Sequence, residues 1–123
     1  MIGASSVAPR TSGGLSVNRL VSAATTNATV VKASAGQVYG WYLSNTNASP
    51  RYVKVYNKAT APTVGTDTPT LTLLVPAGGA ANCEFTNGIA FATGIGFATT
   101  TAAADADTGA VAAGEVVVNL LYA

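Results

Sequence analysis

Bulky and small or polar residues alternate over short segments of this chain, and that period is typical of β-strands. The helical period is absent. Candidate strands lie at 29–33, 37–44, 51–58, 70–75, 83–86, 89–99 and 115–122. Residues 15–24 form either a first short strand or a link into the core. About seven or eight strands at this spacing predict an all-β fold, an antiparallel β-sandwich or jelly roll.

Two aromatic-rich segments indicate which strand faces are buried. In QVYGWYLS (37–44), alternation places Tyr39, Trp41 and Leu43 on one face, and the internal Gly40 indicates a bulge or a close backbone approach. In RYVKVYNK (51–58), Val53 and Val55 share one face. The opposite face carries Tyr52, Lys54 and Tyr56, so this strand is expected to be half-buried with one polar face.

The second half of the chain contains the smallest and the most apolar strand faces. In IAFATGIGFAT (89–99) bulky residues alternate with Ala and Gly, which leaves one nearly smooth face for packing within the domain or for a flat subunit contact. The closing strand, 115–122, is apolar on both faces and is therefore central or at an interface. Asn87–Gly88 is a hairpin signal.

Loops and termini divide the chain into two parts. Residues 59–69 form a long connection that could cross between sheets, 76–81 form a turn, and 100–114 form a small-residue loop. Residues 1–24 are interpreted as an extended N-terminal arm and link, and 25–123 as a single β-sandwich domain. The first 14 residues are either a frayed terminus or an arm that orders on a neighbouring subunit.

Composition narrows the function. Only 9% of residues are charged, against roughly 25% in an ordinary domain. The net charge of +1 gives no indication of the basic surface that nucleic-acid binding requires. No membrane span or signal peptide is evident, so synthesis in a cytoplasm is expected. A neutral surface rich in small residues favours a structural role with permanent protein partners.

Catalytic chemistry finds little support in these residues. Without histidine, no Ser-His-Asp or Cys-His arrangement can be built. The single Cys83 lacks adjacent positive charge, which favours a structural thiol. Asp105 and Asp107 resemble half of a calcium loop, but the other ligands are missing, so a solvated loop is favoured. We expect no enzyme activity, no cofactor and no metal.

Two segments carry a family resemblance: GQVYGWYLSNTNASPRYVKVYNK at 36–58 and EVVVNLLYA at 115–123. They resemble small proteins encoded with the head genes of tailed bacteriophages. The resemblance implies a structural virion protein, similar to β-sandwich and jelly-roll capsid cement or decoration proteins. It implies a location on the capsid surface, the major capsid protein as partner, and a homo-oligomer, either dimer or trimer.

Interface and ligand residues follow from these interpretations. The predicted interface residues come from the arm, the smooth strand face and the second loop: Val7, Pro9, Arg10, Gly94, Gly96, Asp105 and Asp107. The alternative function is a glycan- or host-binding head-fibre or tail module, with the platform Tyr39, Trp41, Tyr52 and Tyr56. Another neck or tail structural component is the third alternative.

Overall fold

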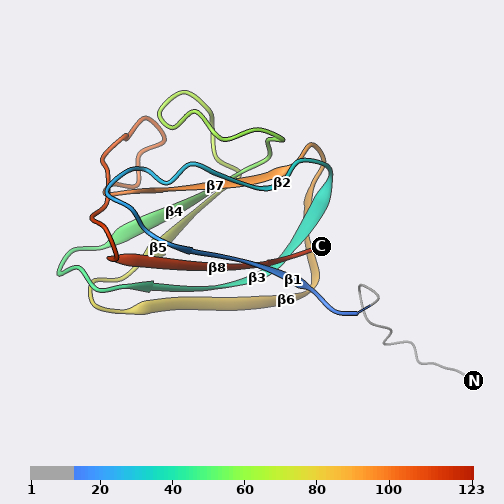
Figure 1. Ribbon diagram of the computed structural model, residues 1–123, viewed down its shortest axis with the longest axis horizontal. Coiled ribbons are helices and arrows are strands. Elements are labelled where there is room, and N and C mark those ends of the chain that lie inside the picture. Colours follow the sequence, from blue (N-terminus) through green and yellow to red (C-terminus); the bar gives the residue numbers. More distant parts are fainter. Residues whose placement is uncertain (1–12) are drawn as a thin grey trace, which may run out of the picture.

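The structure, a computed structural model, describes residues 13–123 as two packed β-sheets (Figure 1). Sheet A has the order β1-β8-β3-β6 and sheet B the order β2-β7-β4-β5, and every strand pair is antiparallel. The strands are β1 (Ser16–Val21), β2 (Thr29–Lys32), β3 (Gly36–Asn45), β4 (Arg51–Tyr56), β5 (Leu71–Val75), β6 (Ala80–Phe91), β7 (Ile95–Thr100) and β8 (Val116–Tyr122). The all-β antiparallel prediction is confirmed.

The order of strands identifies the sandwich as a jelly roll. The first four strands pair with the last four in reverse order: β1 with β8, β2 with β7, β3 with β6 and β4 with β5. Successive pairs alternate between the sheets, as in a long hairpin rolled into two layers. Residues 15–24 therefore supply a strand, and the sandwich includes Ser16–Val21, earlier than the predicted boundary at residue 25.

The core lies between the inner faces of the two sheets. Its buried side chains come from six strands and one loop: Val38, Trp41, Leu43, Val53, Val55, Val75, Phe91, Ile95, Phe97, Val111, Val116, Val118 and Leu120. The rings of Trp41 and Phe85 pack edge to face with centroids 5.1 Å apart. β8 lies between β1 and β3, which confirms its predicted central position.

A bulge in the β3–β6 pair changes two predictions. Gly40 is confirmed at the bulge, because the register shifts between Val38 and Gly40, and a Cβ on Gly40 would lie 2.5 Å from the Cys83 carbonyl oxygen. The shift makes Val38, not Tyr39, the core residue before Trp41. The predicted Asn87–Gly88 hairpin is wrong, since β6 continues through it and Gly88 accommodates the bulge at a φ of 70°.

The prediction of one strand at 89–99 is also wrong. β6 ends at Phe91 in sheet A, and β7 begins at Ile95 in sheet B. Every residue of β7 is buried, so both of its faces are covered. The connection at 59–69 does not cross between sheets, because β4 and β5 are neighbours in sheet B.

Long loops cover the outer face of sheet B over β4 and β7, whereas Leu74 on β5 is 51% exposed. The loops that follow β4 and β7 lie on the side of sheet B away from sheet A (Figure 1). Lys54 and Tyr56, which were expected on an exposed polar face, are 0% and 1% exposed. The Lys54 ammonium donates a 2.6 Å hydrogen bond to the Ala104 carbonyl oxygen in the second loop. Short-range alternation could not reveal this cover, because it comes from distant segments.

Candidate interaction surface

Among residues 13–123, no segment lies over the outer face of sheet A, which is the open face of the sandwich in this part of the chain. Strand register places twelve residues on it in three rows of four, each row running from β1 through β8 and β3 to β6. The rows are Val17, Leu121, Gly40 and Glu84; then Arg19, Asn119, Tyr42 and Asn82; then Val21, Val117, Ser44 and Ala80. We call these twelve residues the A-face.

Apolar side chains on the A-face gather on β1 and β8. Val17 and Val21 are 59% and 46% exposed, and Val117 and Leu121 beside them are half-buried. The β3 and β6 half carries smaller or polar groups, with Tyr42 as its one large side chain at 38% exposure. Burying such a surface against another protein releases water from apolar groups, which favours association.

Two charged side chains lie at opposite edges of the A-face. Arg19 on β1 is exposed and makes no ion pair within residues 13–123. Glu84 on β6 accepts a hydrogen bond from the Tyr42 hydroxyl. This bond, together with desolvation and the Glu84 charge, raises the pKa of Tyr42, which keeps the phenol protonated as a donor. The A-face thus has one positive edge and one negative edge.

The positive edge is also an open strand edge. β1 pairs only with β8 within the described residues, so its other side presents backbone donors and acceptors. Leu15, just before this strand, is 37% exposed. Residues 1–12 precede this edge in sequence. The predicted arm contacts Val7, Pro9 and Arg10 lie outside the described residues.

The other predicted interface residues separate into buried and exposed groups. Gly94 and Gly96 are buried, and Cβ atoms there would lie 2.6 Å from the Lys58 carbonyl oxygen and 3.1 Å from that of Thr29. Their prediction as subunit contacts is wrong, because the chain itself fills the space opposite both glycines. Asp105 is exposed. Asp107 accepts hydrogen bonds from the backbone N–H groups of Ala102 and Gly109, so it shapes its own loop.

The predicted aromatic platform is not assembled. Tyr39 and Trp41 belong to sheet A and are each only 8% exposed. Tyr52 and Tyr56 belong to sheet B, and Tyr56 is 1% exposed. The four rings lie in two sheets and three are buried, so they offer no common binding surface. The prediction failed because it took aromatic residues that are close in sequence to be close on the surface.

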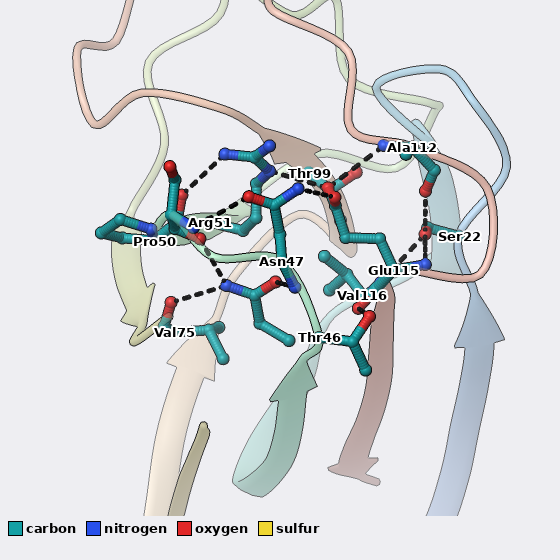
Figure 2. Close-up of polar contacts among 12 residues, drawn as sticks. Ser22, Thr46, Asn47, Pro50, Arg51, Val75, Thr99, Ala112, Glu115 and Val116 are labelled. Atoms are coloured by element: carbon teal, nitrogen blue, oxygen red, sulfur yellow. Dashed lines mark hydrogen bonds and ion pairs between the residues drawn. The ribbon is translucent and has the colours of Figure 1, made fainter. Parts of the chain in front are cut away.

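A polar cluster at one end of the sandwich was missed by sequence reasoning (Figure 2). Glu115, 6% exposed, accepts a 2.7 Å bond from Arg51 Nε, a 2.5 Å bond from Asn47 Nδ2 and a 3.1 Å bond from the Ala112 N–H. The Ser22 hydroxyl accepts from the Glu115 and Val116 N–H groups and donates to the Ala112 carbonyl oxygen. We call these five residues, Ser22, Asn47, Arg51, Ala112 and Glu115, the Glu115 cluster.

The Glu115 cluster joins the end of β1, the β3–β4 loop, the start of β4 and the turn before β8. Burial raises the pKa of Glu115, but the bonds from Arg51, Ala112 and Asn47 lower it by more, so the carboxylate stays ionised. All its partners are donors within the chain, which is typical of a structural ion pair. The sequence does show charged residues at strand boundaries. It does not show which of them pair, because Arg51 and Glu115 are far apart along the chain.

Other reactive groups are held within the chain. Asp67 pairs with Lys58 at 2.5 Å, and this bond and the Thr63 N–H lower the Asp67 pKa. Cys83 is half-buried and packs against the core. No group of three or more metal-ligating side chains occurs in residues 13–123. In the same range there is no helix with the length and hydropathy needed to span a bilayer.

Over residues 13–123, fold and surface together define a jelly-roll domain in which loops cover part of sheet B and the outer face of sheet A is open. No family model matches the chain, and neither curated proteins nor solved structures gave a match.

Proposed function

We propose that this protein is a structural component of a bacteriophage virion. In this role it is a capsid cement or decoration protein that self-associates and stabilises contacts between major capsid protein subunits. The observation that carries the proposal is the A-face, an open sheet surface with four exposed or half-buried aliphatic side chains and only two charges. Such a surface can be covered by protein with few buried charges left unpaired.

Three further observations support this role. The sequence resemblance described above points to phage head genes. The jelly roll is a fold used by viral capsid domains, although lectins and cupins share it, so the fold supports the role by analogy alone. Only 9% of the residues are charged, and such a composition suits repeated protein contacts, in which many weak sites add together around a shell.

The proposal is tested first on particles. Virions with and without this protein are heated, or diluted into low salt, and release of DNA is measured. We expect particles without the protein to open at lower temperature. Equal resistance would refute the stabilising role. Counting copies per major capsid protein, and labelling the protein on the particle, separates a capsid location from a neck or tail location.

The surface is tested by adding variants back to bare particles. Val17→Asp with Val21→Asp places two carboxylates on the A-face, and we expect occupancy to fall at least tenfold at a fixed protein concentration. Leu74→Asp is the matched control, because Leu74 is 51% exposed on sheet B. Equal losses from both variants would show that the A-face has no special part in attachment.

The arm is tested by deletion of residues 1–14. β1 begins at Ser16, so the deletion leaves every strand intact and the domain should fold. We expect weaker attachment to particles with an unchanged unfolding temperature. Attachment with unchanged affinity would contradict the predicted contacts of Val7, Pro9 and Arg10.

A further inference from the structure

The A-face differs between its two halves in a way that suggests its partner. The β1 and β8 half carries Val17, Val21, Val117 and Leu121, whereas in the same two rows the β3 and β6 half carries the small Ser44 and Ala80, the buried Gly40 and the charged Glu84. Arg19 lies at the edge of the bulky half and Glu84 at the edge of the small half. A surface that carries both a feature and its complement can bind a second copy of itself.

We propose that the A-face packs against the A-face of a second copy of this chain, around a twofold axis parallel to the strands. The proposal deepens the function above, and it rests on that function only in taking the A-face to be an association surface. It names the occupant of the face and the orientation of the pair. Shell binding through other surfaces then gains strength from two linked attachment sites.

Shape favours this axis over the other twofold axis in the plane of the sheet. Rotation about an axis parallel to the strands places β1 over the partner's β6, and β8 over the partner's β3. Val21 then lies over the partner's Ala80, and Val117 over the partner's Ser44, so in this row bulky groups meet small ones. Gly40 is buried, because Cys83 and Glu84 of its own chain fill the space where a Cβ would lie, so its row adds no such fit.

Charge favours the same axis. With the axis parallel to the strands, Arg19 lies over the partner's Asn82, and the partner's Glu84 is the next outward side chain along that strand. Twofold symmetry forms this contact twice. An in-plane axis perpendicular to the strands would instead place β1 over the partner's β1 and bring the two Arg19 side chains together. Like charges facing each other across an interface oppose association.

The size of the A-face sets the strength of the pair. Four strands about 4.8 Å apart and three rows about 6.8 Å apart give a footprint of about 400 Å² per copy. A stable interface buries about 800 Å² per partner. We therefore expect a weak dimer, which forms in solution at high protein concentration.

The test is sedimentation of the full chain over protein concentrations from about 1 μM to about 1 mM. We expect a reversible monomer–dimer equilibrium. Arg19→Glu should weaken the dimer about tenfold, because it places two carboxylates together at each of two contacts. Glu84→Arg should weaken it similarly by placing two cations together. The double variant R19E/E84R restores opposite charges and should recover most of the wild-type affinity.

Matched controls separate this effect from misfolding and from general charge effects. Each variant should keep the wild-type unfolding temperature within a few degrees, since both side chains are exposed. Asp105→Arg reverses an exposed acid in the loop over sheet B and should leave the dimer unchanged. A monomer at every concentration, or a double variant no better than the single variants, would overturn the proposal.

Failure of this inference can be distinguished from failure of the proposed function. A chain that attaches to particles but stays monomeric would leave the cement role standing, with capsid protein as the occupant of the A-face, and would refute the dimer. A chain that forms the charge-dependent dimer but does not attach to particles would support the dimer and refute the cement role.

Discussion

Removal of the Glu115 carboxylate should destabilise this domain more than any other change to a charged group that we propose. The side chain is 5% exposed and its oxygens accept three hydrogen bonds, from Arg51, Asn47 and the Ala112 N–H. Glu115→Ala removes all three acceptor contacts at once. Arg51 would then keep its charge at 15% side-chain exposure, with the Pro50 carbonyl oxygen as its remaining described partner.

The expected magnitude follows from this geometry. Removing one partner of a buried ion pair costs about 3–5 kcal/mol, because the other charge is left buried. Arg51 is partly accessible to water, which places the cost near the lower end, at about 3 kcal/mol. For a chain of this size we expect a fall in unfolding temperature of about 10 °C. Glu115→Gln keeps the shape and one acceptor oxygen, so it should cost less, about 1–2 kcal/mol.

The assay is urea unfolding followed by the fluorescence of Trp41, the only tryptophan in the chain and 8% exposed in the fold. Asp105→Asn is the matched control, because it removes one carboxylate charge from an exposed loop position. We expect it to change the free energy of unfolding by less than about 0.5 kcal/mol. Arg51→Met tests the other side of the pair.

The double variant E115A/R51M makes the reasoning refutable. If the two side chains act as a pair, the double variant should be clearly more stable than the sum of the single losses indicates. A Glu115→Ala loss below about 1 kcal/mol, or strictly additive losses, would show that the contact between the two side chains contributes little. The physical argument for a structural role of the Glu115 cluster would then be wrong.

Three further predictions concern pH and packing. The pKa of Glu115 and the pKa of Asp67 are both lowered in the fold. The stabilisation by these two carboxylates is therefore fully present above the unfolded pKa values of 4.5 and 3.8, and it is lost as the pH falls through the folded values. Measurement of the free energy of unfolding below pH 5 should show this loss, and Glu115→Gln should make the loss smaller. Tyr56 is buried and its hydroxyl has no described partner. Tyr56→Phe should therefore leave the free energy of unfolding unchanged or raise it by up to about 1 kcal/mol in the same urea assay. A clear loss of stability would show that the hydroxyl has a partner. Gly94→Ala should cost about 1–3 kcal/mol, because its Cβ would meet the Lys58 and Ala59 backbone, whereas Gly109→Ala, which meets mainly the Thr101 side chain, should cost less.

Local alternation was enough to find most of the strands in this fold. Val53 and Val55 point into the core as their spacing predicted, and Gly40 marks a bulge because a residue without a side chain was needed there. Alternation failed at 89–99, where two strands in different sheets follow one pattern without a break. Period alone does not show where a chain leaves one sheet for the other.

The candidate surface was beyond the reach of sequence reasoning. Each sheet has apolar and charged residues on its outward face, and the paths of the loops decide which of them are covered. Lys54 is polar yet fully buried, because the loop after β7 lies over it. Val17 is apolar yet 59% exposed, because no described segment lies over β1. Two of the interface residues predicted from the sequence, Gly94 and Gly96, are buried, and the open face of the described residues is on sheet A.

The sequence by itself determined the β class, the approximate positions of most strands and a surface with few charges. These properties depend on neighbouring residues, because side chains alternate across a strand whatever lies beyond it. Only the tertiary structure decided the jelly-roll pairing, the pair formed by Glu115 and Arg51, and the presence of Arg19 and Glu84 on one open face. Each of these depends on which distant segments meet, and that is fixed by packing of the whole chain rather than by any local period.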